Sequence, residues 1–119
     1  MEPFNAAAVE AALQNFVGRD LYLHLETTNG AYAGNRPDGT KGMAVCAYVR
    51  NAVVRFSRAT VAGEGPFRTG LQMDDQGWIY AEGLTHWELD EYGRLILAGH
   101  DDQGRLAVAL QLSLTPFVI

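Results

Sequence analysis

The sequence contains a single cysteine, fewer basic than acidic side chains and no long apolar run. One cysteine cannot form an internal disulfide, so a hydrophobic core must stabilise the fold. Nine basic against fourteen acidic residues give a net charge of −5, which disfavours nucleic acid or an anionic membrane as partner. No segment approaches the roughly 20 apolar residues that span a bilayer, and the N-terminus lacks a signal-peptide pattern. We therefore expect a cytoplasmic protein.

The sequence also lacks the short motifs that identify common active sites. A P-loop, a G-x-S-x-G elbow, a C-x-x-C pair and an H-E-x-x-H helix are all missing. The three histidines, His24, His86 and His100, have spacings that match no zinc-binding pattern. We predict no metal, no cofactor and no recognised catalytic group.

What remains is the composition of one folded domain. Hydrophobic residues make up 48% of the chain, and a chain of this length buries roughly two-thirds of its unfolded surface. The second half shows apolar alternation interrupted by three four-residue turns, each ending in glycine. Strands are predicted at 67–73, 78–89, 94–100 and 105–114, and turns at 74–77, 90–93 and 101–104. This pattern predicts an antiparallel meander with one face in a core.

The first half begins with a predicted helix. Asn5 is a plausible N-cap for a helix at about 6–17. The apolar residues of this helix fall on one face, which would dock on the sheet or on a second subunit. A strand at 21–28 alternates leucine with polar residues. Asn29-Gly30 predicts a hairpin with a short return strand at 31–33, followed by an exposed loop at 34–42.

Two further strands, at 43–50 and 53–62, are separated by a tight turn or a bulge at 51–52. The second has irregular alternation, which is typical of strands that bend or serve two sheets. Residues 1–119 are therefore expected to form a single, mainly β domain. It would hold an N-terminal helix and seven or eight antiparallel strands in a coiled sheet, partly closed into an open barrel or sandwich.

Polar side chains inside the predicted strands are candidates for chemistry. His24 and Glu26 share a strand face with Tyr22. This spacing suits an acid/base pair or a metal, and equally a cross-strand hydrogen bond. His100 precedes two aspartates, which could join it in a metal cluster or simply cap the backbone of the turn.

Glu82 lies near Trp78 and Tyr80 in a predicted strand. A desolvated carboxylate there would have a raised pKa suited to acid/base work. The alternative is an ion pair between Glu82 and either Arg50 or Arg68.

Three other features have a simpler interpretation beside the functional one. Cys46 has no base next to it in sequence, so we expect a buried structural thiol. His86 is expected to be a surface or interface histidine. Five basic residues could form a spot for a small anion, or simply solvated strand faces: Lys41, Arg50, Arg55, Arg58 and Arg68.

Several blocks of sequence carry a family resemblance. They read YLHLETT at 22–28, AYVRNA at 47–52, GPFR at 65–68, GWIYAEGLT at 77–85, AGH at 98–100, GRLAVALQLS at 104–113 and PF at 116–117. Taken together and in order, these blocks resemble the YojF family of firmicute proteins, a domain of unknown function. The resemblance spans nearly the whole chain from about residue 20.

The resemblance implies a β-rich fold of bifurcated, coiled sheets and no established catalytic residue. It also implies genomic proximity to a deacetylase of the bacillithiol pathway, and hence a role near low-molecular-weight thiol metabolism. Nine polar or aromatic residues inside the family-like blocks are our candidates for ligand binding: Tyr22, His24, Glu26, Arg50, Asn51, Trp78, Tyr80, Glu82 and His100.

Two functional hypotheses follow. The first is a non-enzymatic small-molecule-binding or accessory module that associates with itself, as a homodimer, or with an enzyme such as the deacetylase. The alternative is a small hydrolase or isomerase. That alternative needs four side chains to converge in one cleft: His24, Glu26, Glu82 and His100.

Overall fold

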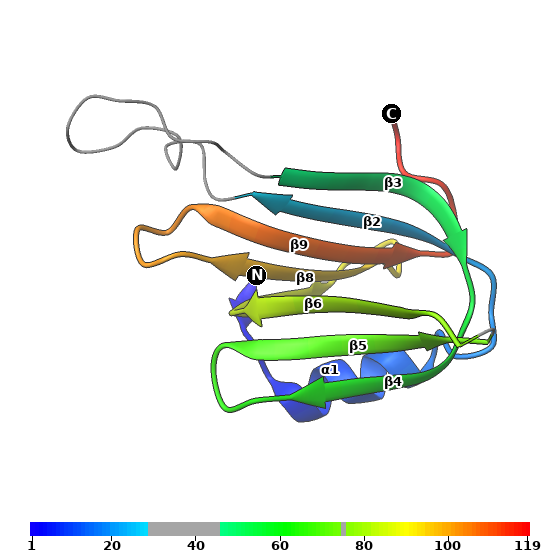
Figure 1. Cartoon of the computed structure of the whole chain (residues 1–119), viewed down its shortest axis with the longest axis horizontal. Coiled ribbons are helices and arrows are strands. Elements are labelled where there is room, and N and C mark those ends of the chain that lie inside the picture. Colours follow the sequence, from blue (N-terminus) through cyan, green and yellow to red (C-terminus); the bar gives the residue numbers. More distant parts are fainter. Residues whose placement is uncertain (29–45, 75) are drawn as a thin grey trace.

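The computed structural model describes residues 1–28, 46–74 and 76–119. In these residues one short helix accompanies two antiparallel sheets (Figure 1). The elements are β1 (Glu2–Pro3), α1 (Ala6–Gln14), β2 (Leu21–Thr28), β3 (Cys46–Val54), β4 (Phe56–Ala62), β5 (Phe67–Met73), β6 (Trp78–Leu84), β7 (His86–Leu89), β8 (Leu95–His100) and β9 (Leu106–Ser113). The predicted hairpin turn at 29–30, strand at 31–33 and loop at 34–42 lie outside the described residues.

The helix begins where the sequence predicts and ends earlier. The Asn5 side chain accepts a hydrogen bond from the Ala8 backbone N–H at 3.0 Å, which confirms the N-cap. The predicted end at residue 17 is wrong, because α1 stops at Gln14 and the chain continues in a tighter turn. There the Phe16 N–H donates to the Leu13 carbonyl, three residues back instead of four.

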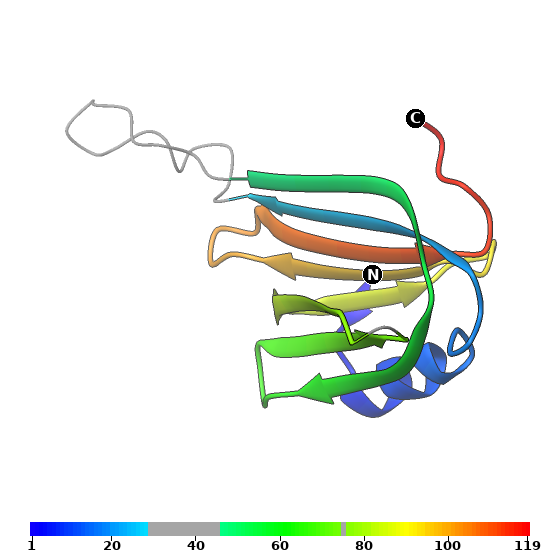
Figure 2. The ribbon, with the colours of Figure 1, turned by 45° about the vertical axis from the view of Figure 1, so that its right-hand side comes forward.

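The apolar stripe of the helix is buried within the same chain. Val9, Leu13 and Phe16 belong to the hydrophobic core, and α1 packs against β4 beside the smaller sheet (Figure 2). A second subunit is therefore not needed to cover this helix.

The strands form a six-stranded sheet, in the order β1-β7-β8-β9-β2-β3, and a three-stranded sheet, in the order β4-β5-β6. Within the described residues neither sheet closes into a barrel, so the arrangement is sandwich-like. The mainly β prediction is confirmed, with nine described strands against seven or eight expected. The two-residue strand β1 was not predicted.

The chain passes between the two sheets at Arg55 and again at Thr85. The predicted strand at 53–62 is divided at Arg55, between β3 and β4, and this confirms that its irregular alternation marks a strand serving two sheets. The predicted strand at 78–89 is divided in the same way at Thr85. The antiparallel pairings of the predicted meander are confirmed, β5 with β6, β7 with β8 and β8 with β9. The strands do not form one sheet, since β5 and β6 pair in one sheet and β7, β8 and β9 in the other.

A close backbone approach holds the two sheets together near the second crossing. A Cβ atom on Gly99 of β8 would lie 2.1 Å from the carbonyl oxygen of Gly83 in β6. Only glycine can occupy position 99 at this separation. Leu97 of β8 and Leu110 of β9 face the shared core and are fully buried.

Candidate functional site

The outer face of the six-stranded sheet carries most of the polar candidates. Residues that face each other directly across antiparallel strands point to the same side of a sheet. One such row crosses five strands: His86 in β7, Ala98 in β8, Ala109 in β9, Glu26 in β2 and Tyr48 in β3. The two alanines are almost completely buried. Ala98 and Ala109 thus separate His86 from Glu26 on this face, and their small side chains do not project between the two.

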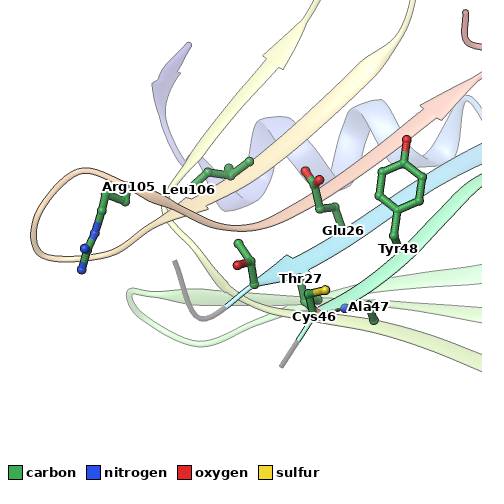
Figure 3. Close-up of a pocket in the computed structure, with 8 residues that line it drawn as sticks. Glu26, Thr27, Cys46, Ala47, Tyr48, Arg105 and Leu106 are labelled. Carbon is green, nitrogen blue, oxygen red and sulfur yellow. Dashed lines mark hydrogen bonds between the residues drawn. The ribbon is translucent and has the colours of Figure 1, made fainter. Parts of the chain in front are cut away.

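A hollow of about 450 Å³ opens at one end of this face. It is lined by Glu26, Thr27, Thr28, Cys46, Ala47, Tyr48, Arg105 and Leu106. Glu26 and Tyr48 rise from neighbouring strands in the same direction (Figure 3). Tyr48 is 60% exposed, so a ligand can reach it from solvent.

Cys46 lies at the start of β3 beside this hollow, and it is exposed. The expectation of a buried thiol is therefore wrong. The reason is that residues 46–49 are all exposed, so the described residues cover neither face of β3 at its start. Sequence alternation alone does not distinguish an edge strand from a central one.

His24 is buried beside the hollow and contacts groups of both charges. Its Nδ1 lies 3.1 Å from Nη1 of Arg50, and its Nε2 lies 3.9 Å from Oε2 of Glu26. Arginine has no acceptor, so Nδ1 must accept this hydrogen bond and the ring proton resides on Nε2, facing Glu26. Burial and the Arg50 charge lower the pKa of His24, while the Glu26 charge opposes them. Neutral His24 is the favoured form.

Arg50 and Asn51 hold the C-terminal segment. Arg50 donates from Nε to the Val118 carbonyl at 3.0 Å, and its guanidinium lies 5.2 Å from the Phe117 ring centre. Asn51 is a bulge residue with φ 60°, which settles the choice between turn and bulge. These two candidates are therefore occupied by contacts within the protein.

Trp78, Tyr80 and Glu82 lie on the other sheet. The rings of Trp78 and Tyr80 stack with centroids 5.4 Å apart, and the Arg68 guanidinium lies 5.3 Å from the Tyr80 ring centre. Arg68 Nη1 is 3.6 Å from Oε1 of Glu82, which confirms the ion-pair alternative. The Glu82 side chain is 71% exposed, so it lacks the desolvation that an acid/base role would need.

His100 pairs with another histidine and not with the neighbouring aspartates. Its Nδ1 lies 3.0 Å from Nδ1 of His86. Oδ1 of Asp101 accepts from the backbone N–H groups of Gln103 and Arg105, each at 2.9 Å. These bonds lower the pKa of Asp101, the Arg105 bond most, and they confirm the turn-capping interpretation.

The contacts between His86 and His100 were missed because linear spacing does not show which strands are neighbours. The signal available in the sequence was that both histidines fall near the ends of adjacent strands of a meander. His86 of β7 is directly opposite Ala98 of β8. His100 lies two residues beyond Ala98, on the same face, so it is the diagonal neighbour of His86.

The remaining candidates are dispersed. Tyr22 is half-buried on the outer face, opposite Val53 and Ser113. Of the proposed basic spot, Arg55 pairs with Asp20 at 3.0 Å, and Lys41 lies outside the described residues. In the described part of the chain, Arg50, Arg55 and Arg68 contact different partners and form no common anion site.

The four residues of the hydrolase or isomerase alternative fall into three contact groups. His24 and Glu26 adjoin each other, His100 contacts His86, and Glu82 contacts Arg68 on the other sheet. Among the described residues, no three His, Cys, Asp or Glu side chains gather in a metal-binding group. No described helix is long and apolar enough to cross a membrane.

The fold and the site define a small, mainly β protein with two coiled antiparallel sheets and a hollow beside the outer face of the larger one. Residues 3–117 match the family described as "Protein of unknown function (DUF1806)", and the chain belongs to this family. It is 47% identical, over 111 residues that cover 93% of each chain, to the "Uncharacterized protein YojF" of Bacillus subtilis (strain 168).

A solved structure agrees with this assignment. The crystal structure of the Bacillus subtilis YojF protein matches with a TM-score of 0.80 and 42% identity, covering 99% of this chain and 97% of that one. The resemblance to the YojF family that the sequence blocks indicate is therefore confirmed.

Proposed function

We propose that this protein is a non-enzymatic module that binds a small molecule in the hollow beside Glu26 and Tyr48. The observation that carries the proposal is the hollow itself, because its volume of about 450 Å³ falls within the range of about 300 to 1,000 Å³ typical of ligand sites. Most of its accessible lining is apolar, and a carboxylate, a phenol and threonine hydroxyls add a few polar groups. Such a lining suits a ligand that has an apolar part and a few hydroxyl or amino groups.

The family resemblance narrows the choice of ligand and partner. It connects the family with a deacetylase of the bacillithiol pathway, so we propose bacillithiol as the first ligand to test and the deacetylase as the enzyme partner. The exposed thiol of Cys46 suits a reducing compartment such as the cytoplasm. The hydrolase or isomerase alternative has less support, because Glu82 contacts Arg68 and not the histidines.

The ligand proposal is tested by titrating bacillithiol into the ¹⁵N-labelled protein, with glutathione as a control thiol. We expect shifts at the amides of Glu26, Ala47 and Leu106 with bacillithiol only. Tyr48→Ala should raise Kd by about ten-fold or more, about 1.4 kcal/mol. Tyr92→Ala is the matched control, since Tyr92 is also exposed, at 74%, and does not line the hollow. No shifts, or shifts centred on Trp78, would contradict the proposal.

Self-association is the second part of the proposal. Among the described strands, β3 is an edge of the six-stranded sheet and exposes Val49 and Val53. An exposed apolar edge strand can pair with its copy in a second molecule. We expect sedimentation to show a homodimer that Val53→Lys converts to a monomer. A monomeric wild-type protein at about 100 μM would contradict this part.

The deacetylase partnership needs its own experiment. Biolayer interferometry with the immobilised enzyme should show binding of the wild-type protein and weaker binding of a variant in the hollow or on β3. Absence of binding, with and without bacillithiol, would remove the enzyme from the proposal without affecting the ligand site.

A further inference from the structure

A pair of histidines lies on the outer face of the six-stranded sheet, apart from the residues that line the hollow. His86 of β7 and His100 of β8 are both half-buried, and their Nδ1 atoms are 3.0 Å apart. Their ring centroids are 4.8 Å apart with an interplanar angle of 75°. Two imidazole nitrogens therefore lie close together at the protein surface.

We propose that this pair binds one divalent transition-metal ion, Cu²⁺ or Ni²⁺, through both Nδ1 atoms. Imidazole nitrogens bind such ions at about 2.05 Å. With this bond length, the nitrogen separation of 3.0 Å gives an N–metal–N angle of about 94°. That is close to the 90° between adjacent ligands of a square-planar or tetragonal ion. A tetrahedral ion such as Zn²⁺ needs a wider separation, about 3.3 Å.

The ring positions agree with a shared ion. Two imidazoles directed at one ion with this angle place their centroids about 4.7 Å apart, and the observed separation is 4.8 Å. A straight N–H···N hydrogen bond would put the centroids about 5.3 Å apart. The observed separation therefore matches the arrangement in which both nitrogens bind one ion.

The surrounding backbone holds both histidines in place. Thr85 Oγ1 accepts from the His100 backbone N–H at 2.9 Å and lies 2.8 Å from His86 Nδ1. The Thr85 N–H donates to the Ala98 carbonyl at 2.9 Å. Next to His100, Gly99 lies tightly against Gly83, which fixes the crossing of the two strands. A site on such a rigid support loses little entropy when it binds.

Binding of the metal ion to the two imidazoles needs no additional proton donor or acceptor. Without metal, one imidazole carries its proton on Nδ1 and donates it to the Nδ1 of the other ring or to Thr85. When the ion binds, that ring moves the proton to Nε2, so both Nδ1 lone pairs become available and no net proton is released. Among the described residues no third His, Cys, Asp or Glu joins the pair, so water would complete the coordination.

The test uses the protein without an affinity tag, because polyhistidine binds the same ions. Calorimetric titration with CuCl₂ or NiCl₂ should show one ion per chain. His86→Asn and His100→Asn should each weaken binding by about ten-fold or more. Asp102→Asn is the matched control, since it changes an exposed carboxylate of the adjacent turn, and it should leave the affinity within two-fold.

A second measurement needs no variant. Substoichiometric Cu²⁺ added to the ¹⁵N-labelled wild-type protein should first broaden the amides of Thr85, His86 and His100. Absence of binding, retention of full affinity in both histidine variants, or broadening centred on His24 or the Met1 amino group would overturn the proposal. If the two histidines only form a hydrogen bond with each other, we expect the first of these results, absence of ion binding.

Discussion

Asn51 and Phe117 lie 66 positions apart and exchange two hydrogen bonds. The Asn51 Oδ1 accepts from the Phe117 N–H at 2.7 Å, and its Nδ2 donates to the Phe117 carbonyl at 2.9 Å. The side chain of a bulge residue thus pairs with the C-terminal segment as a strand backbone would. The position requires both a side-chain amide and a backbone that tolerates φ 60°.

This relationship predicts different losses for two substitutions at residue 51. Asn51→Gly keeps the left-handed backbone and loses both hydrogen bonds, so it should lower the free energy of unfolding by about 2 kcal/mol. Asn51→Ala should cost about 1 kcal/mol more, because a Cβ atom is strained at this φ. Urea unfolding of both variants measures the difference. Equal losses would show that backbone strain is not part of the effect.

The pKa of His24 predicts a stability that depends on pH. Burial and Arg50 lower this pKa in the folded protein from its usual value of 6.5. Below that pH the unfolded chain binds more protons at His24 than the folded one, so the free energy of unfolding falls as pH decreases. Above about pH 7.5 His24 is neutral in both the folded and the unfolded chain, so this loss of stability is absent there. Urea midpoints from pH 5 to 8 should therefore decline more in the wild-type protein than in His24→Asn.

Glu26 provides the control for this pH effect, because its charge raises the pKa of His24. Glu26→Gln should move the His24 imidazole titration, followed by NMR, to still lower pH. An upward movement would mean that Glu26 does not act on His24 as the geometry indicates.

Two neighbouring glycines should differ sharply when replaced by alanine. At Gly99 the new Cβ would lie 2.1 Å from the Gly83 carbonyl oxygen, so Gly99→Ala should cost about 3 kcal/mol or more. At Gly83 the new Cβ meets nothing within 4 Å, and the strain comes only from φ 78°. Gly83→Ala should then cost about 1 kcal/mol. Thermal unfolding of both variants tests this order, and the reverse order would contradict the close packing of β6 on β8.

The aromatic surface of the three-stranded sheet should contribute more to stability than its ion pair. The Tyr80 ring covers Gly70, where a Cβ would lie 2.9 Å from Tyr80 Cε1, and it stacks on Trp78. Tyr80→Ala should cost about 1.5 kcal/mol. Glu82→Gln should cost less than about 0.5 kcal/mol, because its pair with Arg68 is exposed. Chemical denaturation gives the free energy of unfolding of both variants. A larger loss in Glu82→Gln than in Tyr80→Ala would contradict the prediction.

Much of the fold follows from local patterns in the chain. The Asn5 cap, the strand β2 and the turns around Asp90 and Asp101 depend on residues within a few positions of each other, and each was predictable from them. The polar residues of β2 were correctly assigned to one face, because side chains alternate strictly along a strand. Family membership was also evident from long ordered blocks of sequence.

Other features depended on tertiary contacts. Which strands share a sheet was decided at Arg55 and Thr85, where the chain changes sheets, and an apolar alternation that continues across both points does not reveal the change. The exposure of Cys46 followed from the lack of described residues over either face of β3 at its start. The pairing of His86 with His100, and of Asn51 with Phe117, followed from strand register and from the path of the C-terminal segment. Side-chain alternation determines the face of a strand, whereas only the assembled sheets determine which faces and strand ends meet.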